Sequence, residues 1–169
     1  DVDEFVEVAV ANSFGGDLTD ISLTLYNGSN RSTYGSTHDL STFTAGTNDG
    51  TFTYYSKLIT GIQNGGPDGL ALSCDDLAFQ FLSYESMPFV ANGGDADGQT
   101  STDIGTSEPS SAPLSSSIQL IDGVWVYTPG FNTQGEPNVA AATECPELGE
   151  AFVNEFHYDN DGGDVNEFV

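Results

Sequence analysis

Short runs of alternating apolar and polar residues constrain the fold of this chain more than any other feature. Residues 21–26 read Ile-Ser-Leu-Thr-Leu-Tyr, and this period of two is typical of a β-strand with one buried face. Gly, Ser, Thr, Asn and Asp fill the gaps between such runs, and almost no segment has the 3.6-residue period of a helix. The sequence therefore predicts an all-β protein.

Eight segments have the composition or the alternation of strands. They are residues 4–10, 21–26, 51–62, 70–74, 77–84, 117–120, 124–127 and 152–158. Seven or eight short strands separated by turn signals are typical of a β-sandwich. The Ser- and Pro-rich stretch 105–117 predicts an exposed loop, and the polar stretch 135–150 predicts a linker that precedes the last strand.

The net charge narrows the possible partners and the setting. The 169 residues include 26 Asp and Glu but only two basic residues, so the formal net charge is −24. Self-repulsion of this size calls for high salt or divalent cations, which favours an extracellular or cell-surface location. It argues against binding to nucleic acid, whose phosphates are negative. No segment has the roughly 20 apolar residues that span a bilayer, so membrane insertion is not expected.

Two acidic turns are candidate calcium sites. Asp159, Asp161 and Asp164 surround a glycine-containing turn, and Asp95 and Asp97 form a second, shorter cluster. Carboxylate oxygens suit a hard cation such as Ca²⁺. The alternative is that these side chains only cap backbone groups in solvated turns.

Two further pairs of residues fit an extracellular protein. Cys74 and Cys145 are the only cysteines, and an even pair in this setting predicts a disulfide. Asn27 and Asn30 each begin an Asn-x-Ser sequon, so both are candidate glycosylation sites.

The sequence carries no recognisable catalytic set. His38 and His157 are the only histidines, and neither a His-Glu-x-x-His nor a Gly-x-Ser-x-Gly motif is present. His157 lies within a predicted strand, where packing or hydrogen bonding is the expected role, and Trp125 is expected in the core. We therefore predict that the protein is not an enzyme.

The two ends of the chain share a sequence. Residues 164–169 read Asp-Val-Asn-Glu-Phe-Val and residues 1–6 read Asp-Val-Asp-Glu-Phe-Val. Such a repeat is expected in a tandem array or in a head-to-tail polymer, where each unit meets the next through the same surface. The alternatives are coincidence over six residues and a chain that runs slightly past a repeat boundary.

Several segments together carry a family resemblance. The main ones are Asn-Glu-Phe-His-Tyr-Asp-Asn at 154–160, Leu-Thr-Leu-Tyr-Asn-Gly at 23–28, Gly-Ile-Gln-Asn-Gly at 61–65, Pro-Asp-Gly-Leu-Ala-Leu at 67–72 and Gln-Phe-Leu-Ser-Tyr-Glu at 80–85, with 100–105, 117–120 and 128–132 continuing the pattern. They resemble the secreted microbial branch of the lamin-tail domain. The resemblance covers nearly the whole chain and implies an immunoglobulin-like β-sandwich of about seven or eight strands.

The order of the segments departs from that family. There the Asn-Glu-Phe-His-Tyr-Asp-Asn strand comes first, whereas here it follows the body, which therefore lacks its own first strand. A sandwich without one strand has an open edge, which we expect a donor strand to fill. Alternation predicts that one face of this strand enters the core and carries Phe152, Phe156 and Tyr158. The opposite face is predicted to carry Val153, Glu155 and His157.

The donor strand can fold back on its own body, enter the next subunit, or join the units of a covalent array. We favour head-to-tail assembly of copies of this chain by β-strand donation. Residues 1–134 would be the body, 135–150 the linker, and 151–169 the donor strand and the start of the next repeat. The predicted function is a structural subunit of an extracellular filament or surface array. The alternative is a calcium-dependent binding or adhesion module of a larger secreted protein, with the strand in its own body.

Overall fold

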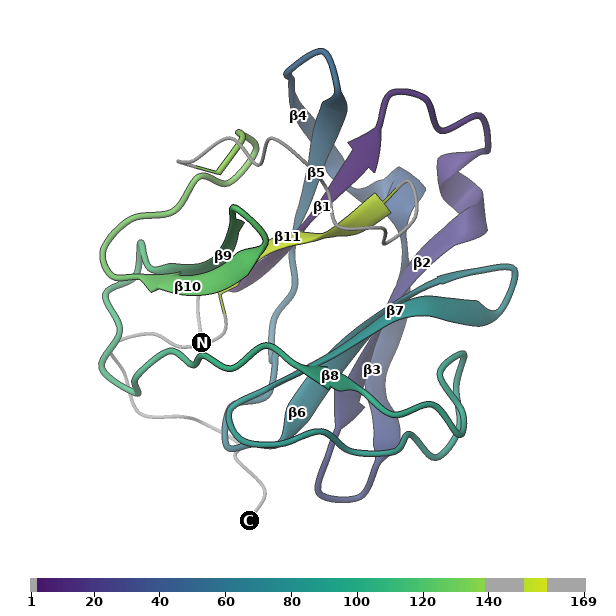
Figure 1. Cartoon of the computed structure of the whole chain (residues 1–169), viewed down its shortest axis with the longest axis vertical. Coiled ribbons are helices and arrows are strands. Elements are labelled where there is room, and N and C mark those ends of the chain that lie inside the picture. The colour runs from purple at the N-terminus through teal and green to yellow at the C-terminus, as the bar shows by residue number, and fades with distance from the viewer. Residues whose placement is uncertain (1–2, 139–150, 158–169) are drawn as a thin grey trace. The chain divides into compact units, whose positions relative to one another are not determined.

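A computed structural model describes residues 3–138 and 151–157 of the chain (Figure 1). Within these residues the protein is all-β, with eleven strands in two sheets and two short 3-10 helices. The chain divides into two compact units, one of residues 1–15, 43–62 and 106–169 and the other of residues 16–42 and 63–105. Each unit contains one of the two sheets.

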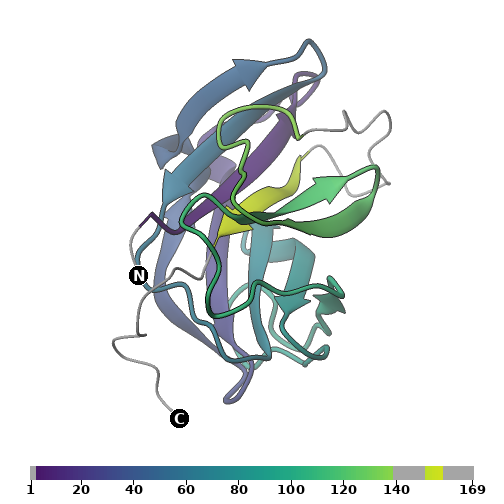
Figure 2. The same cartoon turned by 90° about the vertical axis from the view of Figure 1, so that its left-hand side faces the viewer.

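The first unit holds an antiparallel sheet in the order β10-β9-β11-β1-β5-β4. Its strands are β1 (Phe5–Ala11), β4 (Thr44–Asn48), β5 (Phe52–Leu58), β9 (Ser117–Ile121), β10 (Val124–Thr128) and β11 (Ala151–His157). Although β11 is the last strand among the described residues, it lies between β9 and β1. Figure 2 shows β11 in yellow beside β1 in purple and the green β9–β10 hairpin.

Burial on both faces explains why β1 and β11 are central. Residues 5–10 of β1 and 152–157 of β11 are all buried, which fits the nearly continuous apolar run of β1. Four side chains of this sheet, Ala9, Tyr54, Leu120 and Phe152, form one buried apolar cluster. Burying a large apolar side chain contributes about 1.5–3 kcal/mol, so β11 is an integral part of the core of this unit.

The second unit holds a sheet in the order β3-β2-β6-β7-β8, in which only β7 and β8 pair in parallel. Its strands are β2 (Ile21–Asn27), β3 (Ser32–Asp39), β6 (Asp68–Cys74), β7 (Leu77–Tyr84) and β8 (Thr102–Asp103), and the helices are η1 (Leu18–Asp20) and η2 (Leu40–Thr42). Aromatic rings fill its core. Phe81 lies 5.0 Å from Tyr26 and 5.3 Å from Phe89, measured between ring centroids.

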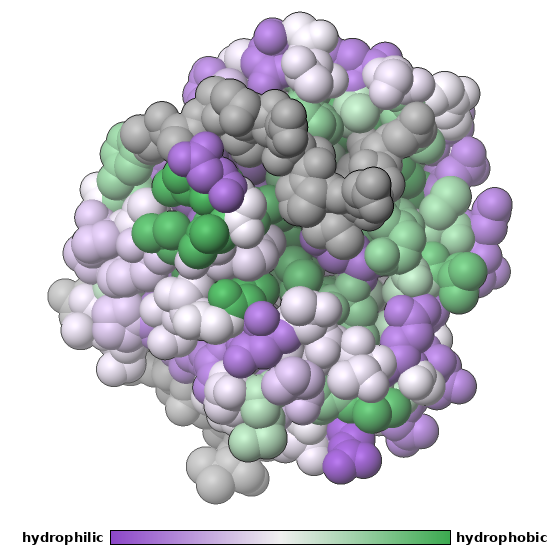
Figure 3. All heavy atoms as spheres, in the orientation of Figure 1, coloured by the Kyte–Doolittle hydropathy of each residue, from purple (hydrophilic) through white to green (hydrophobic). Residues whose placement is uncertain are grey.

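The first sheet ends in an apolar edge strand, β10. Figure 3 shows hydrophobic atoms gathered over the β9–β10 hairpin, and Val124 and Val126 are 61% and 39% exposed. An edge strand presents unpaired backbone groups on which another strand can pair.

The prediction of an all-β fold is confirmed, and each of the eight predicted segments contains a strand. The sequence missed β3, β4 and β8. The first two are strands at sheet edges without a buried residue, so no apolar alternation marks them, and β8 has only two residues. The two sheets are consistent with the predicted β-sandwich. That a strand from a neighbouring copy completes the first sheet remains a prediction.

The prediction of an exposed loop at 105–117 was wrong in part, because Glu108, Ala112 and Ser116 are buried.

The predicted division into body, linker and donor strand follows the order of the sequence and remains a prediction.

Candidate strand-insertion site

The site is the position between β9 and β1 that β11 occupies. β11 pairs with β1 from His157, opposite Phe5, to Ala151, opposite Val10. On its other side, Glu155 and Phe156 pair with β9. Because β11 has partners along both edges, it connects the β9–β10 hairpin to the rest of the sheet.

A β-bulge interrupts this pairing in the middle of β11. Glu155 lies opposite Glu7 and Val153 lies opposite Val8, so Asn154 is an extra residue on the β11 side. The bulge shifts the pairing by one residue between the two phenylalanines, since Phe152 pairs with Ala9 and Phe156 with Val6. That Phe152, Phe156 and Tyr158 share the face that enters the core remains a prediction.

The side chain of Asn154 is held from two sides. Its Nδ2 donates to Glu7 Oε1 at 2.5 Å. Asn138 Nδ2 in turn donates to Asn154 Oδ1 at 2.9 Å and to the Asn154 backbone oxygen at 3.1 Å. The three side chains are at most 6% exposed, and we call them the bulge cluster. It ties β1, β11 and the segment after β10 together.

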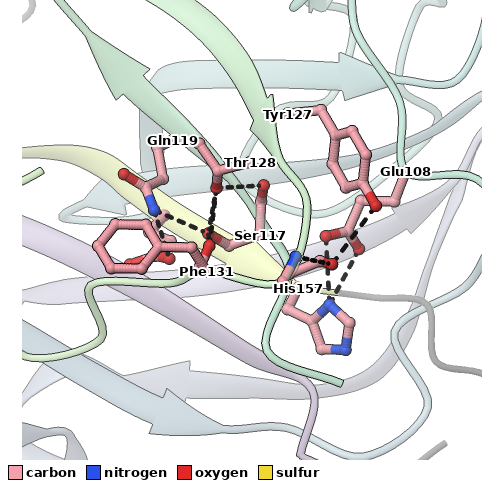
Figure 4. A network of polar contacts seen from close by, with 10 residues as sticks. Glu108, Ser117, Gln119, Tyr127, Thr128, Phe131 and His157 are labelled. Carbon is pink, nitrogen blue, oxygen red and sulfur yellow. Dashed lines mark hydrogen bonds and ion pairs between the residues drawn. The ribbon is translucent and has the colours of Figure 1, made fainter. Parts of the chain in front are cut away.

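Glu155 is held by neighbours of the same cluster. Its carboxylate accepts hydrogen bonds from the Thr133 backbone N–H at 3.1 Å, from Thr133 Oγ1 at 3.1 Å and from Gln119 Nε2 at 3.3 Å. Gln119 also donates to Ser117 on β9 (Figure 4). Glu155 is fully buried, and its place on the face opposite the aromatic side chains remains a prediction.

Burial raises the pKa of both facing carboxyl groups, Glu7 and Glu155. Burial is the largest cause and raises the pKa of Glu7 from 4.5 to about 8. A hydrogen bond from the Gly135 backbone N–H lowers this pKa, whereas the charge of Glu155 raises it. Burial also raises the pKa of Glu155, against hydrogen bonds from Ser117, Thr133 and Gln119 that lower it. Glu7 is therefore mainly protonated at neutral pH.

A buried contact between His157 and Glu108 anchors the end of β11. His157 Nδ1 lies 3.1 Å from Glu108 Oε2, and neither side chain is exposed (Figure 4). The expectation that His157 has a packing or hydrogen-bonding role agrees with this contact. Glu108 lies in the stretch that the sequence predicts as an exposed loop, so hydrophobic periodicity does not predict that Glu108 is buried against His157.

The sequence did contain one signal for Glu7 that was not used. The residue interrupts the run Phe-Val-Glu-Val-Ala-Val at 5–10. A single carboxyl in a strand buried on both faces must find hydrogen-bond partners or keep its proton.

Two of the predicted calcium residues, Asp95 and Asp97, are described, and both accept hydrogen bonds from protein groups. Asp95 Oδ2 accepts a hydrogen bond from Ser73 Oγ at 2.5 Å, and Asp97 Oδ1 accepts one from the Gly93 backbone N–H at 2.7 Å. No group of three or more His, Cys, Asp and Glu able to hold a metal occurs among the described residues. The other three candidates, Asp159, Asp161 and Asp164, lie outside the described residues.

The remaining predicted residues are only partly described. Cys74 ends β6 and is partly exposed, but Cys145 lies outside the described residues, and so does Tyr158 of the donor strand. The disulfide therefore remains a prediction. Asn27 ends β2 and Asn30 lies in the turn between β2 and β3. Asn27 Oδ1 accepts hydrogen bonds from Ser29 in this turn. Glycosylation of either asparagine also remains a prediction.

In the described part of the chain, no helix is long and apolar enough to cross a membrane. No known protein family, curated protein or solved structure matches the chain.

Proposed function

We propose that this protein is a structural subunit of an extracellular filament or surface array, whose units join when β11 of one copy occupies the strand-insertion site of the next. In this proposal the fold is a lamin-tail-like, immunoglobulin-like sandwich. The observation that carries it is the place of β11: the last strand of the sequence fills the middle of a sheet built from much earlier segments.

Strand exchange needs no new contacts. A β11 from a second copy would make the same ladder hydrogen bonds with β1 and β9 and the same buried contacts. Residues 139–150, which follow Asn138, can span up to roughly 40 Å when extended, so their length permits insertion into a neighbour. The repeat of residues 1–6 at 164–169 adds support for a head-to-tail arrangement.

The alternative is a binding or adhesion module whose β11 stays in its own chain. One observation favours it, since β11 pairs with β1 of the same chain in this structure. The acidic surface would then serve a calcium-dependent contact, which is likewise a proposal.

Cysteine trapping separates the two functions. Val10 and Ala151 lie directly opposite each other, at the Cα separation of about 5 Å that a disulfide spans. We would prepare one chain with Val10→Cys and another with Ala151→Cys, both with Cys74→Ser and Cys145→Ser, mix them and oxidise. Exchange predicts a disulfide between the two chains and, for the double variant, a ladder of oligomers on a non-reducing gel.

A closed module predicts no disulfide between the mixed chains and only an intramolecular one in the double variant, which would overturn the proposal. Val126→Lys in β10 is the matched control. If oligomers came from the apolar β10 edge instead, this substitution would disperse them, whereas oligomers joined by β11 would persist.

A further inference from the structure

We infer that the bulge cluster of Glu7, Asn138 and Asn154 selects the strand that enters the insertion site and fixes its register. The site thus accepts a strand with an asparagine at the bulge and a phenylalanine two residues to either side, which residues 151–157 provide from this chain or from a second copy. This inference deepens the proposed function and rests on it for the source of the strand.

The apolar contacts of β11 discriminate poorly between registers. Along β1, Val6, Val8 and Val10 have the same shape at intervals of two residues. A shift of β11 by two residues would keep each face of the strand on the same side, and β1 would present valines at the same intervals as before. These valines alone therefore leave the register weakly specified.

The bulge cluster distinguishes the registers because its polar groups are buried. A shift by two residues would place Phe152 or Phe156 where Asn154 now donates to Glu7 and accepts from Asn138. Leaving one buried polar group without a partner lowers a population roughly 5- to 150-fold. A single buried polar contact that fixes pairing at some expense of stability is a known use of such groups.

The cluster also contacts the bulged residue directly. Asn138 Nδ2 donates both to the side-chain oxygen and to the backbone oxygen of Asn154, so it contacts the one position of β11 that has no residue opposite it. Asn138 additionally donates to the Leu120 backbone oxygen at 2.9 Å. A strand without the bulge would present neither oxygen of Asn154 at this place.

Two cysteine reporters measure the register in the full chain with Cys74→Ser and Cys145→Ser. Ala151→Cys with Val10→Cys reports the native register, and Ala151→Cys with Val8→Cys reports a shift by two residues. In the native register Val8 is two residues away along the strand, beyond the reach of a disulfide. We expect the first pair to form a disulfide and the second to form almost none.

Asn154→Leu removes the polar contacts while keeping a similar volume. We expect it to raise the ratio of shifted to native disulfide at least tenfold, whereas Phe152→Leu, the matched control, leaves the ratio near that of the parent. Asn138→Ala tests the same contact with β11 unaltered and covers the case in which Asn154→Leu does not fold. An unchanged ratio in the folded variants would overturn the inference.

The same gel separates this inference from the proposed function. The ratio of the two disulfides reports the register, and the mass of the linked product reports whether the strand came from the same chain. A register that depends on Asn154 in monomers alone would support the inference and contradict strand exchange.

Discussion

At the scale of single residues, the protonation state of Glu7 controls the charge repulsion inside the insertion site. The side chain of Glu7 is fully buried in a central strand, and the residue lies directly opposite Glu155. Two ionised carboxylates on opposite residues would repel each other in a medium of low dielectric constant. Protonation of Glu7 removes that repulsion. The insertion site is therefore compatible with neutral or mildly acidic solution.

The stability of the protein should depend on pH through Glu7. Because its pKa rises from 4.5 to about 8 on folding, the folded state binds more protons than the unfolded chain between these values. The free energy of unfolding should then fall as the pH rises through this window, by at most about 1.4 kcal/mol per pH unit for this group. The stability that the protonated Glu7 contributes is fully present below pH 4.5 and is lost as the pH rises to about 8.

Urea unfolding of the wild type and of Glu7→Gln, from pH 5 to pH 9, measures this dependence. The variant has no carboxyl to ionise at position 7, so its midpoint should fall less steeply. Some slope should remain, because burial also raises the pKa of Glu155. The exposed Asp122→Asn is the control and should keep the wild-type slope. Parallel curves for wild type and Glu7→Gln would show that Glu7 does not titrate in this range.

At the scale of elements, the segment after β10 supports the insertion site and itself depends on a close backbone contact. Gly135 N–H donates to Glu7, and Gly135 O accepts from the Thr47 N–H on β4 at 2.7 Å. A Cβ at Gly46 would lie 2.2 Å from Gly135 O, closer than any real contact. Glycine at position 46 thus permits β4 to hold this segment against β1.

Replacing Gly46 by Ala should therefore destabilise the protein by about 1–3 kcal/mol, because backbone must move to accept the methyl group. The free energy of unfolding from urea titration measures this loss. Gly15→Ala is a matched control, since a Cβ there meets no atom within 4 Å, and its effect should stay within about 0.5 kcal/mol. Equal effects of the two substitutions would contradict the role given to Gly46.

At the scale of the whole molecule, the net charge of −24 opposes folding through self-repulsion. Raising NaCl shortens the Debye length from about 10 Å at 0.1 M to about 3 Å at 1 M, so the melting temperature should rise over this range. Differential scanning calorimetry in NaCl, with sucrose at equal osmolality as the control for non-ionic effects, measures the rise. A melting temperature that does not respond to NaCl would mean that this charge does not limit stability.

The sequence by itself determined the fold class and where most strands lie. The period of two and the turn residues are local properties, readable within a few residues, so β2 and the apolar strands β1, β6 and β11 could be placed from them. The same local rule failed for the exposed edge strands β3 and β4, which bury too little apolar surface to show alternation.

Only the tertiary structure decided what surrounds β11. The bulge at Asn154 shifts the pairing with β1 by one residue, and no local pattern marks it, because it depends on a strand more than 140 residues earlier in the sequence. The contacts between Asn154 and Glu7 and between His157 and Glu108 likewise join distant segments. The free energy of a buried polar group depends on its partners, and the fold supplies these partners from far along the chain.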